Sequence, residues 1–213
     1  MAAGRSGCGW AHNVFNSGQA ELGKVRQPKR LKGMDMATES IVLAGGCFWC
    51  LDAVYAKVKG IVAVESGYCN GHVVQPTYEQ VCTGRTGHAE VVRLKFDPTL
   101  ISLREILEIF FVIHDPTTLN AQGNDHGSQY RSGIYFLDAS QQQVAQDILQ
   151  ELVASGMYTR PLVTEVLPLH NYSAAEDYHQ DFFARNPNQG YCLAVAAPKV
   201  AKFRKTFARL ALD

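Results

Sequence analysis

Two cysteines stand three positions apart directly after a pair of glycines, in the segment Gly45–Cys50, which reads Gly-Gly-Cys-Phe-Trp-Cys. Glycine permits a sharp backbone turn, and a helical pattern of apolar residues begins just after it. Cys47 is therefore expected at the N-terminus of a helix, where unpaired N–H groups and the helix dipole favour the thiolate over the thiol. This position predicts that Cys47 is a nucleophile. The alternative is a buried cysteine that packs beside two core aromatic residues.

The spacing of Cys47 and Cys50 also occurs in zinc sites and in thioredoxin-like proteins. Structural zinc takes four ligands, usually from two such pairs, and the sequence has no second Cys-x-x-Cys and no His-x-x-x-His. Residues 88–90 read His-Ala-Glu, as in zinc deaminases, but those enzymes place a Pro-Cys-x-x-Cys after this motif rather than before it. Thioredoxin-like motifs have Trp before the first cysteine and Gly-Pro between the two. We therefore expect no metal site here.

Glu90 begins a segment, residues 90–96, in which Val92, Leu94 and Phe96 alternate with Arg93 and Lys95. It shares its parity with Val92, Leu94 and Phe96, so its side chain is expected to point towards the apolar face of a strand. Burial raises the pKa of a carboxyl group, which can then act as a proton donor near neutral pH. The alternative is a glutamate at the strand end that reaches solvent.

Three further features have functional character. The polar, glycine-bounded segment Gly123–Ser132 is expected to be a loop rich in hydrogen-bonding groups, which is typical of a site or of an elaborate turn. Tyr78 offers a phenolic donor or a cover for the core. Cys192 follows a glycine-containing segment that we expect to be mobile, so it is a candidate for the second thiol of a disulfide. The alternative is an inert buried cysteine.

The elements that must position these residues follow from hydrophobic periodicity. Strands are expected at residues 41–44, 61–68, 90–96 and 134–137, with helices after the first, the third and the fourth. Residues Ser102–Glu105 read as a capping box that opens the second helix. This order predicts an α+β fold with a ferredoxin-like split βαβ core, a mixed sheet covered by helices. A strand near Leu162–Leu167 and a helix from about Pro198 form a C-terminal extension.

Composition limits the classes of function. The chain has 213 residues, with 20 Lys+Arg balanced by 20 Asp+Glu and 46% hydrophobic residues. This balance argues against a nucleic-acid partner, which requires excess positive charge. The longest apolar run, Tyr191–Ala197, is far shorter than the ~18 residues of a membrane-spanning helix. We expect a globular protein with one domain and no membrane partner.

Residues 1–38 differ from the remainder. Through Gly33 they hold six basic residues and one acidic residue without periodicity, so we expect a flexible basic tail followed by a single catalytic domain at residues 39–213. The tail suits an organelle transit peptide or an extension upstream of an internal start at Met34 or Met36. The cysteines follow no secretory signal, which favours reduced thiols and a cytoplasmic location.

Taken together, the motifs resemble those of the A-type peptide methionine sulfoxide reductases, which act on the S epimer. The resemblance runs from Ile41 to Cys192, and it implies an α+β fold around a ferredoxin-like core. The segments that carry it are Gly46–Trp49, Pro76–Tyr78, Thr86–Glu90, His114–Thr117, Gln122–Asp125, Gln129–Ser132, Tyr178–Gln180 and Gly190–Cys192.

The resemblance also implies roles. Cys47 is the nucleophile, and Phe48 and Trp49 form a wall for the substrate methyl group. The proton donor Glu90 is assisted by Tyr78 and Tyr130, and Asp125 belongs to the same catalytic site. The family reduces methionine sulfoxide, free or in proteins, through a cysteine sulfenic acid and then a disulfide. Thioredoxin restores the thiols, no metal or organic cofactor is needed, and the function is protein repair after oxidative damage. We expect the chain to be a monomer.

The chain departs from the common family pattern at two places. Cys50 replaces the glycine that many members have after Phe-Trp, and Cys69–His72 replaces a commoner Gly-Gly. Two thiols could therefore resolve the sulfenic acid. We expect Cys192 to do so, with Cys50 as the alternative, because a Cys47–Cys50 bond would be strained and hard for thioredoxin to reach. Cys8, Cys69 and Cys82 receive no role.

Two other functions stay open from the sequence. One is a general thiol peroxidase or disulfide oxidoreductase that uses Cys47 and Cys50. The other is a non-catalytic module that binds methionine or a metal.

Overall fold

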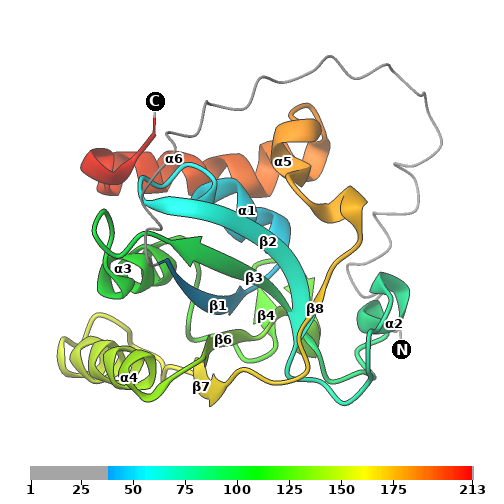
Figure 1. Cartoon of the computed structure of the whole chain (residues 1–213), viewed down its shortest axis with the longest axis horizontal. Helices are drawn as coiled ribbons and strands as arrows, with labels where there is room; N and C mark the ends of the chain where they lie inside the picture. Colours follow the sequence, from blue (N-terminus) through cyan, green and yellow to red (C-terminus); the bar gives the residue numbers. More distant parts are fainter. Residues whose placement is uncertain (1–37, 213) are drawn as a thin grey trace.

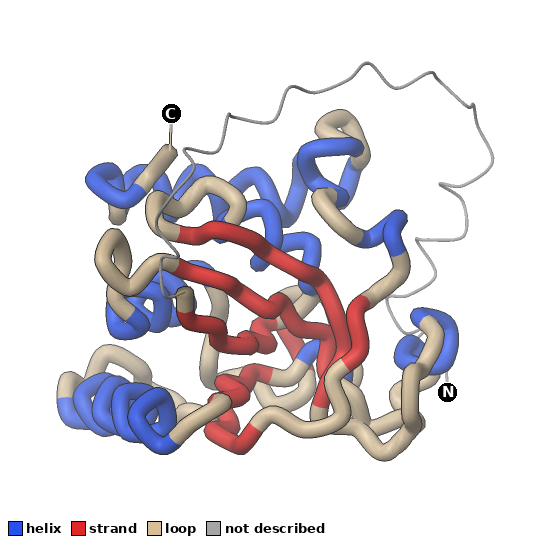
Figure 2. Tube along the Cα trace, viewed as in Figure 1, coloured by secondary structure: helices blue, strands red, loops and turns tan. Residues whose placement is uncertain are grey.

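The structure, a computed structural model, describes residues 38–212. Its centre is a six-stranded sheet of order β7-β6-β1-β3-β2-β8 (Figures 1 and 2). The strands are β1 (Glu39–Gly45), β2 (Ile61–Cys69), β3 (Ala89–Phe96), β6 (Ser132–Phe136), β7 (Glu165–Pro168) and β8 (Ser173–Ala174). The expected basic tail lies outside the described residues except for Thr38.

The sheet confirms the predicted fold class. The chain runs β1, α1 (Phe48–Tyr55), β2, β3, α3 (Leu103–Ile113) and β6, and these strands lie in the order β6-β1-β3-β2 with antiparallel neighbours. This is the split βαβ arrangement of ferredoxin-like folds. β7 adds in parallel beside β6, and β8 adds in antiparallel beside β2.

The remaining elements are short, apart from two helices. These elements are α2 (Tyr78–Cys82), the strand pair β4 (Ala121–Gln122) and β5 (Asp125–His126), α4 (Ala139–Ala154), α5 (Phe182–Arg185), α6 (Ala197–Thr206), a π-helical turn (Cys192–Ala196), and 3-10 helices at Ser128–Tyr130, Asp177–His179 and Ala208–Leu210. Figure 1 shows α5 and α6 lying over α1. Within the described residues, none of the helices combines the length and apolar composition that crossing a bilayer requires.

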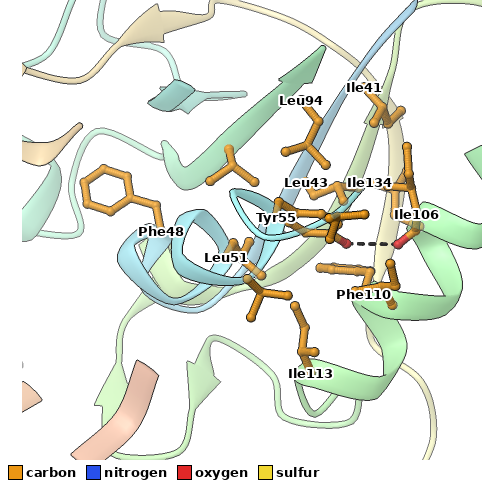
Figure 3. Close-up of a cluster of buried hydrophobic side chains, with 14 of the residues drawn as sticks. Ile41, Leu43, Phe48, Leu51, Tyr55, Leu94, Ile106, Phe110, Ile113 and Ile134 are labelled. Carbon is orange, nitrogen blue, oxygen red and sulfur yellow. Dashed lines mark hydrogen bonds between the residues drawn. The ribbon is translucent and has the colours of Figure 1, made fainter. Parts of the chain in front are cut away.

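The main core lies between the sheet and the helices on one of its faces (Figure 3). Apolar side chains from β1, β3 and β6 meet those of α1 and α3, and the Tyr55 hydroxyl donates a hydrogen bond to the Ile106 carbonyl at 2.9 Å. The expected capping box is confirmed, since Ser102 Oγ accepts from Glu105 N at 3.2 Å while Glu105 Oε2 accepts from Ser102 N at 2.9 Å.

A smaller cluster covers the opposite face of the sheet. Val42, Ala44 and Val91 are fully buried there, with Leu169 and Tyr172 packed against the cluster. β1 is thus covered on both faces, which explains its continuous apolar sequence from Ile41 to Ala44. The strand therefore holds the segment that follows it, residues 46–50, in a fixed place.

Several local predictions need correction. The polar segment Gly123–Ser132 is not a plain loop, because it holds β5 and a 3-10 helix whose hydrogen bonds the sequence pattern does not show. The later strand is shorter than expected, because only Glu165–Pro168 pairs with β6. Cys192 lies in a π-helical turn that runs directly into α6, rather than on an open approach.

Candidate active site

Cys47 is the N-cap residue of α1, as its position after two glycines predicts. Gly46 has φ +89°, and a Cβ atom there would lie 2.6 Å from Gln122 Cγ, so both the turn and the close packing require glycine. The backbone N–H of Phe48, at the first helical position, donates to Glu90 Oε2 at 3.2 Å. Glu90 therefore binds one of the unpaired N–H groups next to Cys47.

Glu90 lies on the same face of β3 as Val92 and Leu94, as the alternation predicts. Its side chain is 1% exposed. Burial raises the pKa of this carboxyl to about 8, and the Phe48 N–H lowers it only in part. A substantial fraction of Glu90 is thus protonated at neutral pH, the form that can donate a proton.

The pKa of the Cys47 thiol differs from the prediction. It is raised well above its ordinary value, first by burial and then by the negative charges of Glu90, Cys50 and Asp125, whereas a hydrogen bond with Tyr191 lowers it. The expected preference for the thiolate is therefore wrong, because desolvation and acidic neighbours outweigh the helix terminus. When Glu90 is protonated, one of the negative charges that raise the pKa of Cys47 is removed.

Tyr78, Tyr130 and Asp125 gather around the same two groups. Tyr78 begins α2 and Tyr130 ends a 3-10 helix, and both are buried. Burial raises the pKa of each phenol, and the charges of Glu90, Cys47 and Asp125 raise both further. Both phenols therefore stay protonated, the form in which a phenol can donate a hydrogen bond. The structure thus brings together the residues that the sequence separates.

Phe48 and Trp49 form an aromatic wall beside Cys47, with ring centroids 6.3 Å apart. Trp49 stacks on Phe182 at 3.7 Å with an interplanar angle of 6°. Its indole N–H donates to His179 Nδ1 at 3.1 Å, so the ring is held both by a face and by an edge. The wall is therefore rigid.

His179 and Glu176 complete this support and were not assigned roles from the sequence. Burial lowers the pKa of His179 to about 4, so the imidazole is neutral and accepts the Trp49 N–H. Glu176 accepts from the Tyr78 backbone N–H and from the Tyr68 hydroxyl, both at 2.9 Å. His179 lies in the segment Tyr178–Gln180, which carries part of the family resemblance and could have indicated a role. No sequence motif around Glu176 indicates one.

Tyr191 is the third residue that the sequence leaves without a role. Its hydroxyl donates to Asp125 Oδ2 at 2.7 Å and lies 3.7 Å from Cys50 Sγ. The phenol also lowers the pKa of the Cys47 thiol. Tyr191 thereby joins the C-terminal extension to the surroundings of Cys47.

Cys50 and Cys192 are both buried, and each carries a free thiol. Cys50 lies on α1 at 1% exposure, packed near Ala53 and Ala196. Burial, and to a smaller extent the negative charge of a Cys50 thiolate, raise the pKa of Cys192 to about 11. Ionisation of Cys50 therefore opposes ionisation of Cys192.

Comparison with known proteins agrees with this geometry. The family model "Peptide methionine sulfoxide reductase" matches residues 39–211. The chain is 53% identical over 182 residues to "Peptide methionine sulfoxide reductase MsrA" of Polynucleobacter asymbioticus, covering 85% of this chain and 94% of the relative. The MsrA of Deinococcus radiodurans is 45% identical over 201 residues, covering 93% and 97%.

Solved structures resemble the chain over most of its length. Mxr1 from Saccharomyces cerevisiae in reduced form matches with a TM-score of 0.69 and 36% identity, covering 76% of this chain and 92% of that one. Methionine sulfoxide reductase A of Corynebacterium diphtheriae matches with a TM-score of 0.65 and 35% identity, covering 75% and 79%. By sequence, fold and site, this chain belongs to the peptide methionine sulfoxide reductase family.

Proposed function

We propose that the chain reduces methionine S-sulfoxide, free or within proteins, to methionine, with Cys47 as the nucleophile. The observation that carries this proposal is the pairing of the Cys47 thiol with a buried acid, Glu90, whose pKa of about 8 keeps it able to donate a proton. Family membership supports the same reaction.

The sulfoxide sulfur becomes electrophilic when its oxygen is protonated or strongly hydrogen-bonded. In the proposal Glu90 donates that proton, and the phenols of Tyr78 and Tyr130 hold the developing oxyanion. Cys47 attacks the sulfur as its own proton is released, so the site regains the proton that Glu90 gave. The oxygen passes to Cys47, which becomes a sulfenic acid, and methionine is released.

The aromatic wall suits the other end of the substrate. The rings of Phe48 and Trp49 offer an apolar surface for a thioether methyl group. The support from Phe182 and His179 keeps the Trp49 ring in one orientation, as discrimination between sulfoxide epimers requires. These contacts support preference for a methyl sulfoxide over small oxidants such as hydrogen peroxide.

One experiment tests the proposal directly. Dithiothreitol-driven turnover is measured with a peptide S-sulfoxide, the matching R-sulfoxide and hydrogen peroxide. Turnover of the S epimer alone is expected. Equal rates on both epimers would contradict the epimer assignment, faster use of peroxide would favour a thiol peroxidase, and no turnover would favour a binding module.

The proposal includes recycling by thioredoxin, with Cys192 as the thiol that delivers the disulfide to it. A relative supports this partner, because Mxr1 from Saccharomyces cerevisiae has been solved in complex with Trx2; that structure matches with a TM-score of 0.50 and 26% identity, covering 72% of this chain and 91% of that one. Cys192 itself is buried, but Leu193 next to it is 57% exposed, so the thiol lies just beneath the surface.

Removal of the Cys192 thiol is expected to leave sulfoxide reduction intact but to prevent recycling by thioredoxin. Cys192→Ser should release one equivalent of methionine in a single burst and then lose thioredoxin-dependent turnover, because its disulfide no longer reaches the surface. Methionine release is followed with and without thioredoxin and its reductase. Thioredoxin-dependent turnover at the wild-type rate would show that another thiol serves thioredoxin.

The proposal also covers organisation. Residues 39–213 act as one catalytic unit, and a monomer suffices because Cys47, Glu90, Tyr78, Tyr130 and Asp125 all come from one chain. The location that we propose is the cytoplasm, where a thioredoxin-dependent cycle would keep Cys47, Cys50 and Cys192 reduced.

A further inference from the structure

The carboxylate of Glu176 connects groups from three separate parts of the chain. Its Oε1 accepts the backbone N–H of Tyr78, and its Oε2 accepts the hydroxyl of Tyr68, both at 2.9 Å. Oε2 also lies 3.9 Å from His179 Nε2. Tyr78 begins α2, Tyr68 belongs to β2, and His179 ends a 3-10 helix. One carboxylate therefore joins the sheet to two segments of the proposed site.

The bond to the Tyr78 N–H fixes the point from which the phenol extends. The capping box of α2 links Thr77 to Gln80, two residues at the start of the same short helix. The bond from Glu176 instead attaches the first residue of α2 to a segment 98 positions away in the chain. Movement of this residue would displace the phenol from Glu90, and a misplacement of about 1 Å can slow a reaction about 10²-fold.

A second branch runs through the imidazole of His179, which is fully buried. Its Nδ1 accepts the Trp49 indole N–H, so the neutral ring carries its proton on Nε2. Nε2 has no hydrogen-bond partner among the described residues. The carboxylates of Glu176 and Glu79 act on this ring, Glu176 more strongly. A negative charge beside Nε2 favours the proton there, which keeps Nδ1 available to hold Trp49.

The His179 ring also lies against both groups that these branches reach. Its centroid is 4.4 Å from that of the Tyr78 ring and 5.6 Å from that of Trp49. Because packed interiors transmit small shifts, a displaced imidazole would disturb the phenol and the aromatic wall together.

The segment that carries Glu176 is itself tied to the sheet. β8 pairs with β2, and just after β8 the Ala175 N–H donates to the Ser66 carbonyl at 2.9 Å. The Gln180 side chain accepts from Ser66 N at 2.9 Å and donates to the carbonyls of Ser66 and Ala175, at 2.9 and 3.0 Å. Residues 175–180 are thus held at both ends, as a residue that orients others requires.

We propose that Glu176 is a positioning residue that sets the Tyr78 phenol and the Trp49 ring at the same time. This inference rests on the proposed function, in which the phenol stabilises the oxyanion and the ring contacts the substrate methyl group. Glu176 acts through these two groups and not on the sulfoxide itself. Removal of this one carboxylate therefore weakens oxyanion stabilisation and methyl recognition together.

The test combines Glu176→Ala with Tyr78→Phe in a double-mutant cycle. Single-turnover methionine release at a series of sulfoxide concentrations gives a maximal rate and an apparent Kd for each variant. Glu176→Ala should lower the maximal rate about 10–100-fold alone, but less than about threefold once Tyr78→Phe has removed the hydroxyl. Its apparent Kd should rise in both backgrounds. Equal decreases in rate in both backgrounds would overturn the proposal, because a general loss of structure does not depend on that hydroxyl.

Glu176→Gln is the conservative variant. Its side-chain oxygen can still accept the Tyr78 N–H, and its amide can donate to the Tyr68 hydroxyl, so the maximal rate should stay within about threefold of wild type. A rate as low as that of Glu176→Ala would contradict positioning by the bond to the Tyr78 N–H. Glu65→Ala is the matched control, because Glu65 lines the same surface hollow but accepts from Tyr172 instead, and its rate should equal that of wild type.

The indole N–H signal of Trp49 tests the second branch without turnover. Trp10→Phe leaves Trp49 as the only tryptophan, so its indole resonance can be followed by nitrogen-15 NMR. Glu176→Ala should shift this resonance and Glu65→Ala should not, and an unchanged resonance would contradict the branch through His179. Absence of a methionine burst from wild-type enzyme would instead contradict the proposed function, and the indole signal would still decide whether Glu176 positions Trp49.

Discussion

Cys47→Ser is expected to abolish methionine sulfoxide reduction. The hydroxyl that replaces the thiol has no adjacent strong base and is a far weaker nucleophile than a thiolate. Because the side chain is buried at the N-cap of α1 and serine is similar in size, the fold should be retained. Single-turnover methionine release measures the effect, and thermal unfolding verifies the fold.

The outcome that would contradict this assignment is residual activity. Retention of more than a few per cent of the wild-type rate would mean that another group attacks the sulfoxide. Cys69→Ser provides the control for loss of a buried thiol outside the site, and it should reduce the substrate at the wild-type rate.

Glu90→Gln is expected to slow the sulfoxide-reduction step by about 10²–10⁴-fold, the usual contribution of a general acid. Glutamine keeps the size and accepts the Phe48 N–H, but it has no proton to transfer. Stopped-flow measurement of sulfenic acid formation isolates this step. A rate within a factor of about three of wild type would exclude proton donation by Glu90.

The pH dependence of the reduction rate provides a second test of proton donation by Glu90. Glu90 donates only when protonated, so the wild-type rate should fall as pH rises through about 8, and Glu90→Gln should lack that decrease. Asp52→Asn is a control, because burial also raises the pKa of this α1 carboxyl, to about 7, although no role in the reaction is proposed for it. Its pH profile should match that of wild type.

Local patterns predict most of the core fold. Alternation along residues 90–96 gives both the strand and the face of Glu90, and the Ser102–Glu105 box gives the start of α3. These features depend on neighbours within a few positions in the chain. Local patterns do not predict short elements such as β5, because a two-residue strand has too few residues to show a period.

The rest of the site depends on distant contacts. Trp49 and His179 are 130 positions apart, and Cys50 and Tyr191 are 141 apart, so no local pattern shows that they meet. The pKa of Cys47 also escapes prediction, because it depends on how deeply the folded chain buries the thiol and which acids lie beside it. A helix N-terminus seen in the sequence gives only one of these contributions.

The residues around Cys47 come from two parts of the chain, the ferredoxin-like core and the C-terminal extension. Cys47 and Glu90 belong to the ferredoxin-like core, whereas His179, Phe182 and Cys192 belong to the segment that lies over α1. The two parts are joined at the site, because Glu176 of the extension accepts the Tyr78 N–H and Tyr191 donates to Asp125. A change in the extension that alters recycling is therefore also expected to alter the residues around Cys47.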